Sequence, residues 1–132
     1  MYQRQVSFPE AVNRAIKDNY CNFNGRASRS EFWWFELFVV ILGFIITIAN
    51  SFLYIATHSS VIGMVLLYGT NLALLLPSIG LHVRRLHDIG KSGWYIFLSF
   101  IPFVGAIILI VWYCKDSQPM PNEYGPVPNV VG

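Results

Sequence analysis

Charged side chains are scarce in this chain, and their scarcity excludes an ordinary soluble fold. Only 12% of the 132 residues are Asp, Glu, Lys or Arg, whereas 55% are hydrophobic. A soluble domain carries about 25% charged residues, because polar side chains must cover its core. The small size also excludes more than one domain. We therefore expect a protein that exposes apolar surface to lipid.

The chain also lacks a strong net charge, a cysteine framework and a recognisable leader. A formal charge of +2 is too small to indicate a nucleic-acid partner. Cys21 and Cys114 lie on either side of the apolar region, so we expect neither a disulfide nor a metal site from them. Residues 1–31 lack the apolar core of a signal peptide. The first apolar segment is therefore expected to act as an uncleaved insertion signal.

The apolar residues fall into three blocks that predict the architecture. They cover residues 32–57, 61–83 and 94–113. Each block reaches or approaches the ~20 residues that a helix needs to cross a bilayer. A helix pair buried in a soluble protein is the alternative, and these lengths argue against it. The predicted fold is an all-α membrane protein, a bundle of three transmembrane helices over residues 23–113.

Polar segments flank this transmembrane domain. Ser7 and Glu10 have the spacing of a capping box, and apolar residues recur at helical spacing after them. We predict that residues 1–22 form an amphipathic helix in the headgroup region, its apolar face toward the lipid or the bundle. A frayed soluble tail is the alternative. Residues 114–132 are rich in proline, which predicts an irregular C-terminal tail.

Aromatic residues predict where the spans meet the membrane surface, because rings with a polar edge settle at the headgroup boundary. One cluster opens the first block, and two clusters bracket the third. The predicted belt comprises Trp33, Trp34, Trp94, Tyr95, Trp112 and Tyr113. Trp94 and Trp112 are ~27 Å apart along a helix, which favours a third block that crosses the membrane once.

The basic residues predict the orientation. They precede the first span and lie within residues 84–93, whereas the turn at residues 58–60 has none. By the positive-inside rule the N-terminus and the 84–93 loop are cytoplasmic, and a tail that follows a third full span faces outward. Pro102 and Gly105 interrupt the third block. They either kink one helix, which the aromatic spacing favours, or break the block into a re-entrant hairpin that returns the tail to the cytoplasm.

Two polar segments beside the predicted cytoplasmic face are the functional candidates, because charges pair more strongly beside a low-dielectric slab than in water. Arg84 and Arg85 are the expected partners of Asp88. They are also the expected partners of Glu31 or Glu36. The residues predicted to form ion pairs, or to contact lipid or a partner, are Arg26, Arg29, Glu31, Glu36, Arg84, Arg85, His87, Asp88 and Lys91.

Glu36, Asn50 and Asn71 are the carboxylate and the two amides inside the predicted spans. Glu36 falls about one turn inside the first aromatic cluster, where an ion pair with a loop arginine or snorkelling to the headgroups is favoured over a proton-responsive role. Asn50 and Asn71 lie on the polar faces of the first two spans. Helix packing is their expected role, and a polar translocation path is the alternative.

No complete catalytic, nucleotide or metal set is recognisable in the sequence. Residues 90–92 read Gly-Lys-Ser like the end of a phosphate-binding loop, but Arg85 stands where the first glycine is needed. His82 and His87 are five residues apart and fall on different helix faces. We therefore predict no cofactor, no metal and no enzymatic activity.

Four motifs resemble one bacterial family. They are Phe23–Phe35 (FNGRASRSEFWWF), Arg84–Tyr95 (RRLHDIGKSGWY), Ile101–Gly105 and Asn122–Pro126. The chain resembles, over about residues 15–128, the inner-membrane family catalogued as domain of unknown function 805. The resemblance implies a bacterial inner-membrane protein with a few spans, and it carries no established activity. Met120 stands where members often have glycine, so a different turn is expected there.

Two classes of function follow from these patterns. The first is a non-enzymatic membrane interaction subunit whose rim contacts a partner protein or anionic lipid headgroups, each basic residue gaining ~1 kcal/mol from acidic lipid. A homo-oligomer and a complex with another membrane protein are both compatible with this class. The alternative is a small transporter or channel component that uses the polar faces around Asn50 and Asn71.

Overall fold

The computed structural model describes residues 7–125. Parts of the predicted N-terminal helix (residues 1–6) and of the predicted tail (residues 126–132) lie outside the described residues. The helical elements are α1 (Phe8–Asn13), η1 (Arg14–Asp18, a π-helical turn), α2 (Arg29–Thr57), α3 (Val61–Asp88), η2 (Gly93–Phe100, a 3-10 helix) and α4 (Val104–Tyr113). The described chain is thus mostly helical, as predicted.

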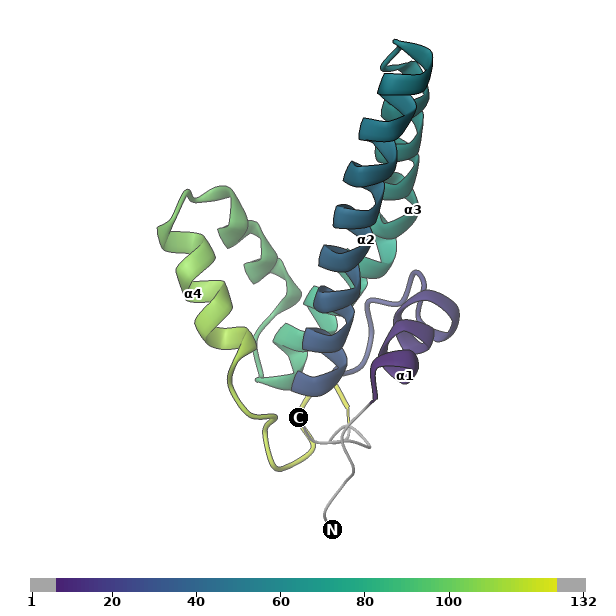
Figure 1. Cartoon of the computed structure of the whole chain (residues 1–132). Helices are drawn as coiled ribbons and strands as arrows, with labels where there is room; N and C mark the ends of the chain where they lie inside the picture. Colours follow the sequence, from purple (N-terminus) through teal and green to yellow (C-terminus); the bar gives the residue numbers. More distant parts are fainter. Residues whose placement is uncertain (1–6, 126–132) are drawn as a thin grey trace.

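α2 and α3 form a long antiparallel hairpin (Figure 1). Their 29 and 28 residues correspond to rods of roughly 43 and 42 Å, and both are apolar enough to cross a membrane. Ser28 opens α2 by accepting a hydrogen bond from the Glu31 N–H at 3.3 Å, which confirms the predicted capping box. His58 ends α2 in the left-handed conformation at φ 54°, and the chain reverses into α3.

Pro77 interrupts the hydrogen bonding of α3 and is compensated from outside the helix. A proline has no N–H, so the carbonyl four residues earlier, that of Ala73, loses its helical donor. The hydroxyl of Tyr20 donates to this carbonyl at 2.7 Å. The segment that follows η1 therefore satisfies a backbone carbonyl that the helix itself leaves without a donor.

The N-terminal helical segment packs on the base of the α2–α3 hairpin (Figure 1). Ala11 and Ala15 are fully buried. The ring of Phe8 meets that of Trp34 edge-on, with 5.9 Å between the ring centroids. Small buried side chains allow close approach to α2. The apolar face predicted for this helix is therefore directed toward the bundle.

The third apolar block is a helical hairpin, and the favoured prediction of one kinked span is wrong. Its arms, η2 and α4, have eight and ten residues. Lengths of roughly 16 and 15 Å cannot cross a core ~30 Å thick. The chain reverses at Pro102, which has no N–H, and at Phe103, which has φ 62°. At Gly105 a side chain would overlap the carbonyl oxygen of Leu98, so glycine allows the two arms to touch.

The aromatic clusters of this block therefore mark one end of the molecule. Tyr95 of η2 and Trp112 of α4 meet edge-on, with ring centroids 5.3 Å apart. The predicted separation of the two clusters assumed a single continuous helix, whereas the chain folds back between them. As a result, α4 ends at the same end of the bundle where α2 begins, so the start of the tail lies at that end rather than at the opposite end that a third full span would give.

The buried core lies at this shared base. Away from it, the α2–α3 hairpin and the η2–α4 hairpin diverge (Figure 1). The arms of α2 and α3 keep large apolar side chains exposed, such as Phe44 (68%) and Leu72 (69%). The members of the core cluster are Ala15, Ala27, Phe32, Phe35, Leu81, Leu86, Leu109 and Tyr113. Protein packing therefore organises the base, while the apolar arms are suited to lipid.

Candidate functional site

We call the base of the bundle the polar rim and define it by Arg26, Glu31, Arg84, Arg85 and Asp88. These side chains come from the connector before α2, the first turn of α2 and the end of α3. All five side chains are at least 96% buried. The two polar segments that the sequence singled out therefore meet inside the protein.

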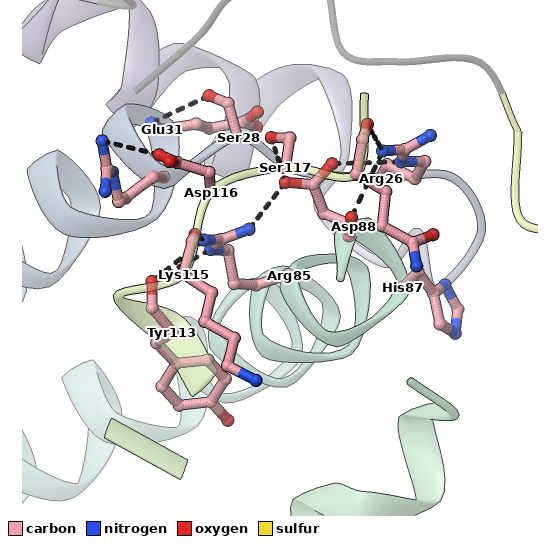
Figure 2. Close-up of polar contacts among 12 residues, drawn as sticks. Arg26, Ser28, Glu31, Arg85, His87, Asp88, Tyr113, Lys115, Asp116 and Ser117 are labelled. Atoms are coloured by element: carbon pink, nitrogen blue, oxygen red, sulfur yellow. Dashed lines mark hydrogen bonds and ion pairs between the residues drawn. The ribbon is translucent and has the colours of Figure 1, made fainter. Parts of the chain in front are cut away.

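Asp88, the last residue of α3, lies at the centre of the polar rim (Figure 2). Its Oδ1 atom accepts from Nε of Arg26 at 3.0 Å, and its Oδ2 atom accepts from Nη1 of Arg85 at 2.6 Å. The Ser117 hydroxyl also donates to Oδ2. Of the two partners predicted for Asp88, Arg85 is confirmed, whereas Arg84 pairs with Glu31 instead. A carboxylate buried between two guanidinium groups has the charged partners it needs away from water.

Most of the other hydrogen bonds of Arg26 go to backbone carbonyls of the tail. Nη2 donates to the carbonyl of Gln118 at 2.8 Å and to that of Asp88 at 3.2 Å. Nη1 donates to the carbonyls of Met120 at 3.0 Å and Gly125 at 3.3 Å. The irregular tail offers these carbonyls because a helix would use them internally. Arg26 thereby holds the tail against the end of α3.

Arg85 binds the segment that leaves α4. Its Nε and Nη2 atoms donate to the Tyr113 carbonyl at 3.2 and 3.0 Å, and Nη2 also donates to the Lys115 carbonyl. The carbonyl groups at the end of a helix have no intrahelical donor and carry partial negative charge. Arg85 therefore joins the end of α4 to the end of α3 and fixes the η2–α4 hairpin at the rim.

Arg84 and Glu31 form the second buried ion pair. Nη1 of Arg84 lies 3.1 Å from Oε1 of Glu31, as predicted. Arg14 of η1 lies 4.0 Å from Oε2 of Glu31. The Nε and Nη2 atoms of Arg84 are buried and have no hydrogen-bond partner among the described residues. This guanidinium is thus only partly satisfied, in contrast to those of Arg26 and Arg85.

Glu36 lies outside this cluster. Its Oε1 atom is 3.4 Å from Nε2 of His82, and 30% of its side chain is exposed. Of the two roles predicted for Glu36, the ion pair with a loop arginine is wrong because the contact is with His82, whereas snorkelling to the headgroups stays a prediction. Arg85 binds Asp88 and the carbonyls after α4, and Arg84 pairs with Glu31 instead of Glu36.

His87 and Tyr124 form one wall of an apolar cavity of about 620 Å³ beside η2. Their rings stack with centroids 3.9 Å apart. Nδ1 of His87 lies 3.1 Å from the Gly25 carbonyl, which only accepts, so the proton is on Nδ1. Partial burial raises the pKa of Tyr124, and Glu123 adds to the rise, so the stacked phenol is neutral near pH 7.

The other predicted rim residues lie nearer the surface. Arg29, with 37% of its side chain exposed, pairs with Asp116 at 3.0 Å. The Lys91 ammonium lies 5.0 Å from the centroid of the Trp112 ring. Trp33 donates through Nε1 to the Tyr113 carbonyl at 3.3 Å. Trp33 thus donates to the same carbonyl that Arg85 binds.

Asn50 and Asn71 do not lie together. The Asn50 amide donates to the Gly63 carbonyl at 3.2 Å and so links α2 to α3. Asn71 is exposed and donates to the carbonyl of Leu67 in its own helix at 2.9 Å. Helix packing accounts for the hydrogen bond of Asn50, and a translocation path stays a prediction.

Two contacts at the rim were not predicted from the sequence. Arg14 is not among the predicted rim residues, yet it approaches Glu31. Its position between the buried Ala11 and Ala15 is a signal that could have placed it beside the bundle. Ser117 reaches Asp88 from a segment without periodicity, and no sequence signal indicates that contact. Within residues 7–125, no group of three His, Cys, Asp or Glu side chains could hold a metal ion.

The comparisons with known proteins agree with this architecture. The family described as protein of unknown function DUF805 matches residues 20–126. The inner membrane protein YhaI of Escherichia coli K12 is 37% identical over 111 residues, which cover 84% of this chain and 89% of YhaI. The inner membrane protein YhaH of the same strain is 35% identical over 115 residues, which cover 87% and 93% respectively. No solved structure matches the chain. With the family match extending over most of its length, this chain belongs to the DUF805 family.

Proposed function

We propose that this protein is a non-enzymatic inner-membrane subunit whose base lies at the cytoplasmic face and contacts anionic lipid headgroups. The observation that carries this proposal is the distribution of positive charge. Every lysine and arginine among residues 7–125 lies on the segments gathered at the base, and the opposite turn at residues 58–60 has none. The positive-inside rule then assigns the base to the cytoplasm.

The η2–α4 hairpin strengthens this assignment. A third full span would carry Lys115 to the opposite side, whereas the hairpin returns it beside Arg85. The long helices α2 and α3 are then the two crossings, and the short hairpin enters the membrane without crossing it. Inner-membrane location is also what the names of the two E. coli relatives state for those proteins.

Only some of these cations are available to lipid. Arg26 and Arg85 are occupied by Asp88 and by tail carbonyls. Lys17 and Lys115 are exposed at the base. Each such charge near a cytoplasmic leaflet gains about 1 kcal/mol from acidic lipid. Lipid attraction through exposed lysines leaves the buried ion pairs intact.

The test is the headgroup composition of lipid retained by the purified protein. Wild type extracted from bacterial membrane in a mild detergent should be enriched in phosphatidylglycerol and cardiolipin over phosphatidylethanolamine, relative to the bulk membrane. The Lys17→Glu/Lys115→Glu double variant should lose most of this enrichment. Ser59→Glu, at the opposite turn, is the matched control and should keep it. Equal enrichment in the wild type and the double variant would contradict the proposal.

A further inference from the structure

The apolar cavity beside η2 lies between four segments that are distant in the sequence. Its volume of about 620 Å³ falls within the range of roughly 300–1,000 Å³ that is usual for small-molecule sites. The lining comes from the connector before α2, the end of α3, η2 and the tail, and most of its residues carry rings: Phe23, His87, Trp94, Phe97 and Tyr124. The cavity is thus large enough for a small organic molecule and is mainly aromatic.

His87 contributes one hydrogen-bond acceptor to this apolar lining. Only 9% of the residue is exposed. Its Nδ1 atom donates to the Gly25 carbonyl, so Nε2 carries a lone pair and no proton. Nε2 has no hydrogen-bond partner within residues 7–125, and it is not one of the unpartnered atoms that the protein encloses completely. A buried side chain therefore keeps an acceptor that a ligand can reach.

Gly93 leaves the space in front of this nitrogen clear. A Cβ atom at position 93 would lie 3.5 Å from Nε2 of His87 and 2.7 Å from Cγ1 of Val83. The missing side chain therefore allows η2 to approach α3 without covering the imidazole. Because Gly93 and His87 both line the cavity, the unpartnered nitrogen faces it.

The chemistry of the lining restricts the ligand. None of the cavity's described lining residues is Asp, Glu, Lys or Arg, so a charged ligand would lose its hydration without gaining a counterion. A neutral hydroxyl group satisfies Nε2, whereas a purely apolar ligand leaves a buried acceptor unpaired at a cost in free energy. Ser92 adds a hydroxyl that can donate to the oxygen of the same ligand. The rings of Phe23 and Phe97 favour a flat aromatic body, because aromatic pairs gain energy beyond the burial of their area.

We propose that this cavity binds a membrane-soluble phenol or hydroquinone, whose hydroxyl group donates a hydrogen bond to Nε2 of His87. The ring of the ligand packs among the aromatic side chains, and its apolar substituents follow η2. The site is distinct from the anionic lipid contact proposed above, because neither Lys17 nor Lys115 lines the cavity. Binding alone is proposed, with no step of oxidation or reduction.

The test compares two ligands that differ only in the hydrogen-bond donor. They are 4-hexylphenol and its methyl ether, which keeps the ring and the alkyl chain but cannot donate. Binding to the full-length protein in phosphatidylcholine nanodiscs is measured by titration calorimetry, and empty nanodiscs give the background from partitioning. These nanodiscs contain no anionic lipid, so the result is independent of the function proposed above.

Two variants and a control separate the hydrogen bond from general effects on folding. His87→Asn keeps an N–H donor for the Gly25 carbonyl but lacks Nε2. The Gly93→Ala/Val83→Ala double variant puts a methyl group in front of Nε2 and removes the Val83 methyl groups that it would meet. Phe100→Leu changes an exposed ring of η2 that does not line the cavity, and it is the matched control.

Wild type and Phe100→Leu should bind the phenol about tenfold more tightly than the ether, because the ether leaves Nε2 unsatisfied. His87→Asn and the double variant should bind the two compounds alike. This ratio does not change if a variant merely loosens the cavity, since both ligands are affected equally. Equal binding of both compounds to the wild type, which a cavity for lipid acyl chains would also give, overturns the proposal. A preference for the phenol that survives in His87→Asn overturns it as well, as does wild-type binding no greater than that of empty nanodiscs.

Discussion

The two hairpins of this protein have similarly apolar sequences, but their helices differ in length. α2 and α3 continue for 29 and 28 residues before and after their turn, whereas η2 and α4 have eight and ten. Both reversals use a residue with positive φ, His58 in the first hairpin and Phe103 in the second. What differs is how far the chain runs before the reversal. Apolar composition shows that a segment enters the membrane, and helix length decides whether it crosses.

The hairpins also differ in how they are held together. Asn50 bonds across the long hairpin to Gly63, and most of that hairpin's surface is apolar and exposed. The short hairpin is attached at its base, where Arg85 and Arg26 bind the carbonyls that follow α4. The short hairpin thus depends on the polar rim, and the far part of the long hairpin does not.

The strongest test of this comparison is to determine on which side of the membrane residues 59 and 114 lie. With Cys21→Ser leaving only Cys114, a membrane-impermeant maleimide should not label intact spheroplasts, because the proposed orientation together with the short hairpin puts residue 114 in the cytoplasm. Ser59→Cys in a background lacking both natural cysteines should be labelled, because two crossings place that turn outside. Both should react after permeabilisation. External labelling of both Cys114 and the Ser59→Cys variant would mean that the third block crosses.

Asp88→Ala should produce the largest change in stability. It leaves two buried guanidinium groups without their carboxylate, which costs about 3–5 kcal/mol when one partner of a buried pair is removed. Because the rim holds the short hairpin, limited proteolysis should cut between Tyr113 and Gly125 first, with α2 and α3 still protected. Asp116→Ala removes the exposed partner of Arg29 and should change stability little. Equal effects of the two variants would contradict the central role of Asp88.

A smaller loss is expected from Gly105→Ala. The new methyl group would overlap the Leu98 carbonyl and force apart η2 and α4, at a cost of about 1–3 kcal/mol. Gly69→Ala in α3 is the matched control, since a methyl group there meets open space. Thermal unfolding in detergent should show a lower midpoint for Gly105→Ala alone. A control that is equally destabilised would mean that the close contact is not the cause.

The smallest effect is expected at the proline of the long hairpin. Tyr20→Phe removes the donor to the Ala73 carbonyl and should cost about 1 kcal/mol or less, since Tyr20 is partly exposed. In a Pro77→Ala background the helix regains its own N–H donor, so the same substitution should matter less. Unfolding free energies of the four combinations give the coupling directly. Additive effects would show that Tyr20 does not compensate for Pro77.

Local patterns predicted much of the fold and part of the rim. Ser28 and Glu31 placed the start of α2, because a capping box acts within one turn of helix. The ion pair between Arg85 and Asp88 followed from a spacing of three residues within α3. The pair between Glu31 and Arg84 followed from two polar segments expected at the same membrane face. The partner of Glu36 was missed, because choosing between His82 and an arginine requires knowing which guanidinium groups are already occupied.

The sequence alone determined three properties of this protein. It is a membrane protein, its first long helix begins after Ser28, and its two polar segments lie at one end of the bundle. Those properties depend on composition and on spacings within a few residues, which act before the chain folds. Only the tertiary structure decided that the third block turns back and that the tail returns to the rim. Both depend on contacts between residues distant in sequence, such as Gly105 beneath the Leu98 carbonyl and Arg26 on the carbonyls of residues 118–125. Backbone carbonyls are present in every residue and leave no pattern in the sequence, so an arginine that binds them can be located only once the chain is folded.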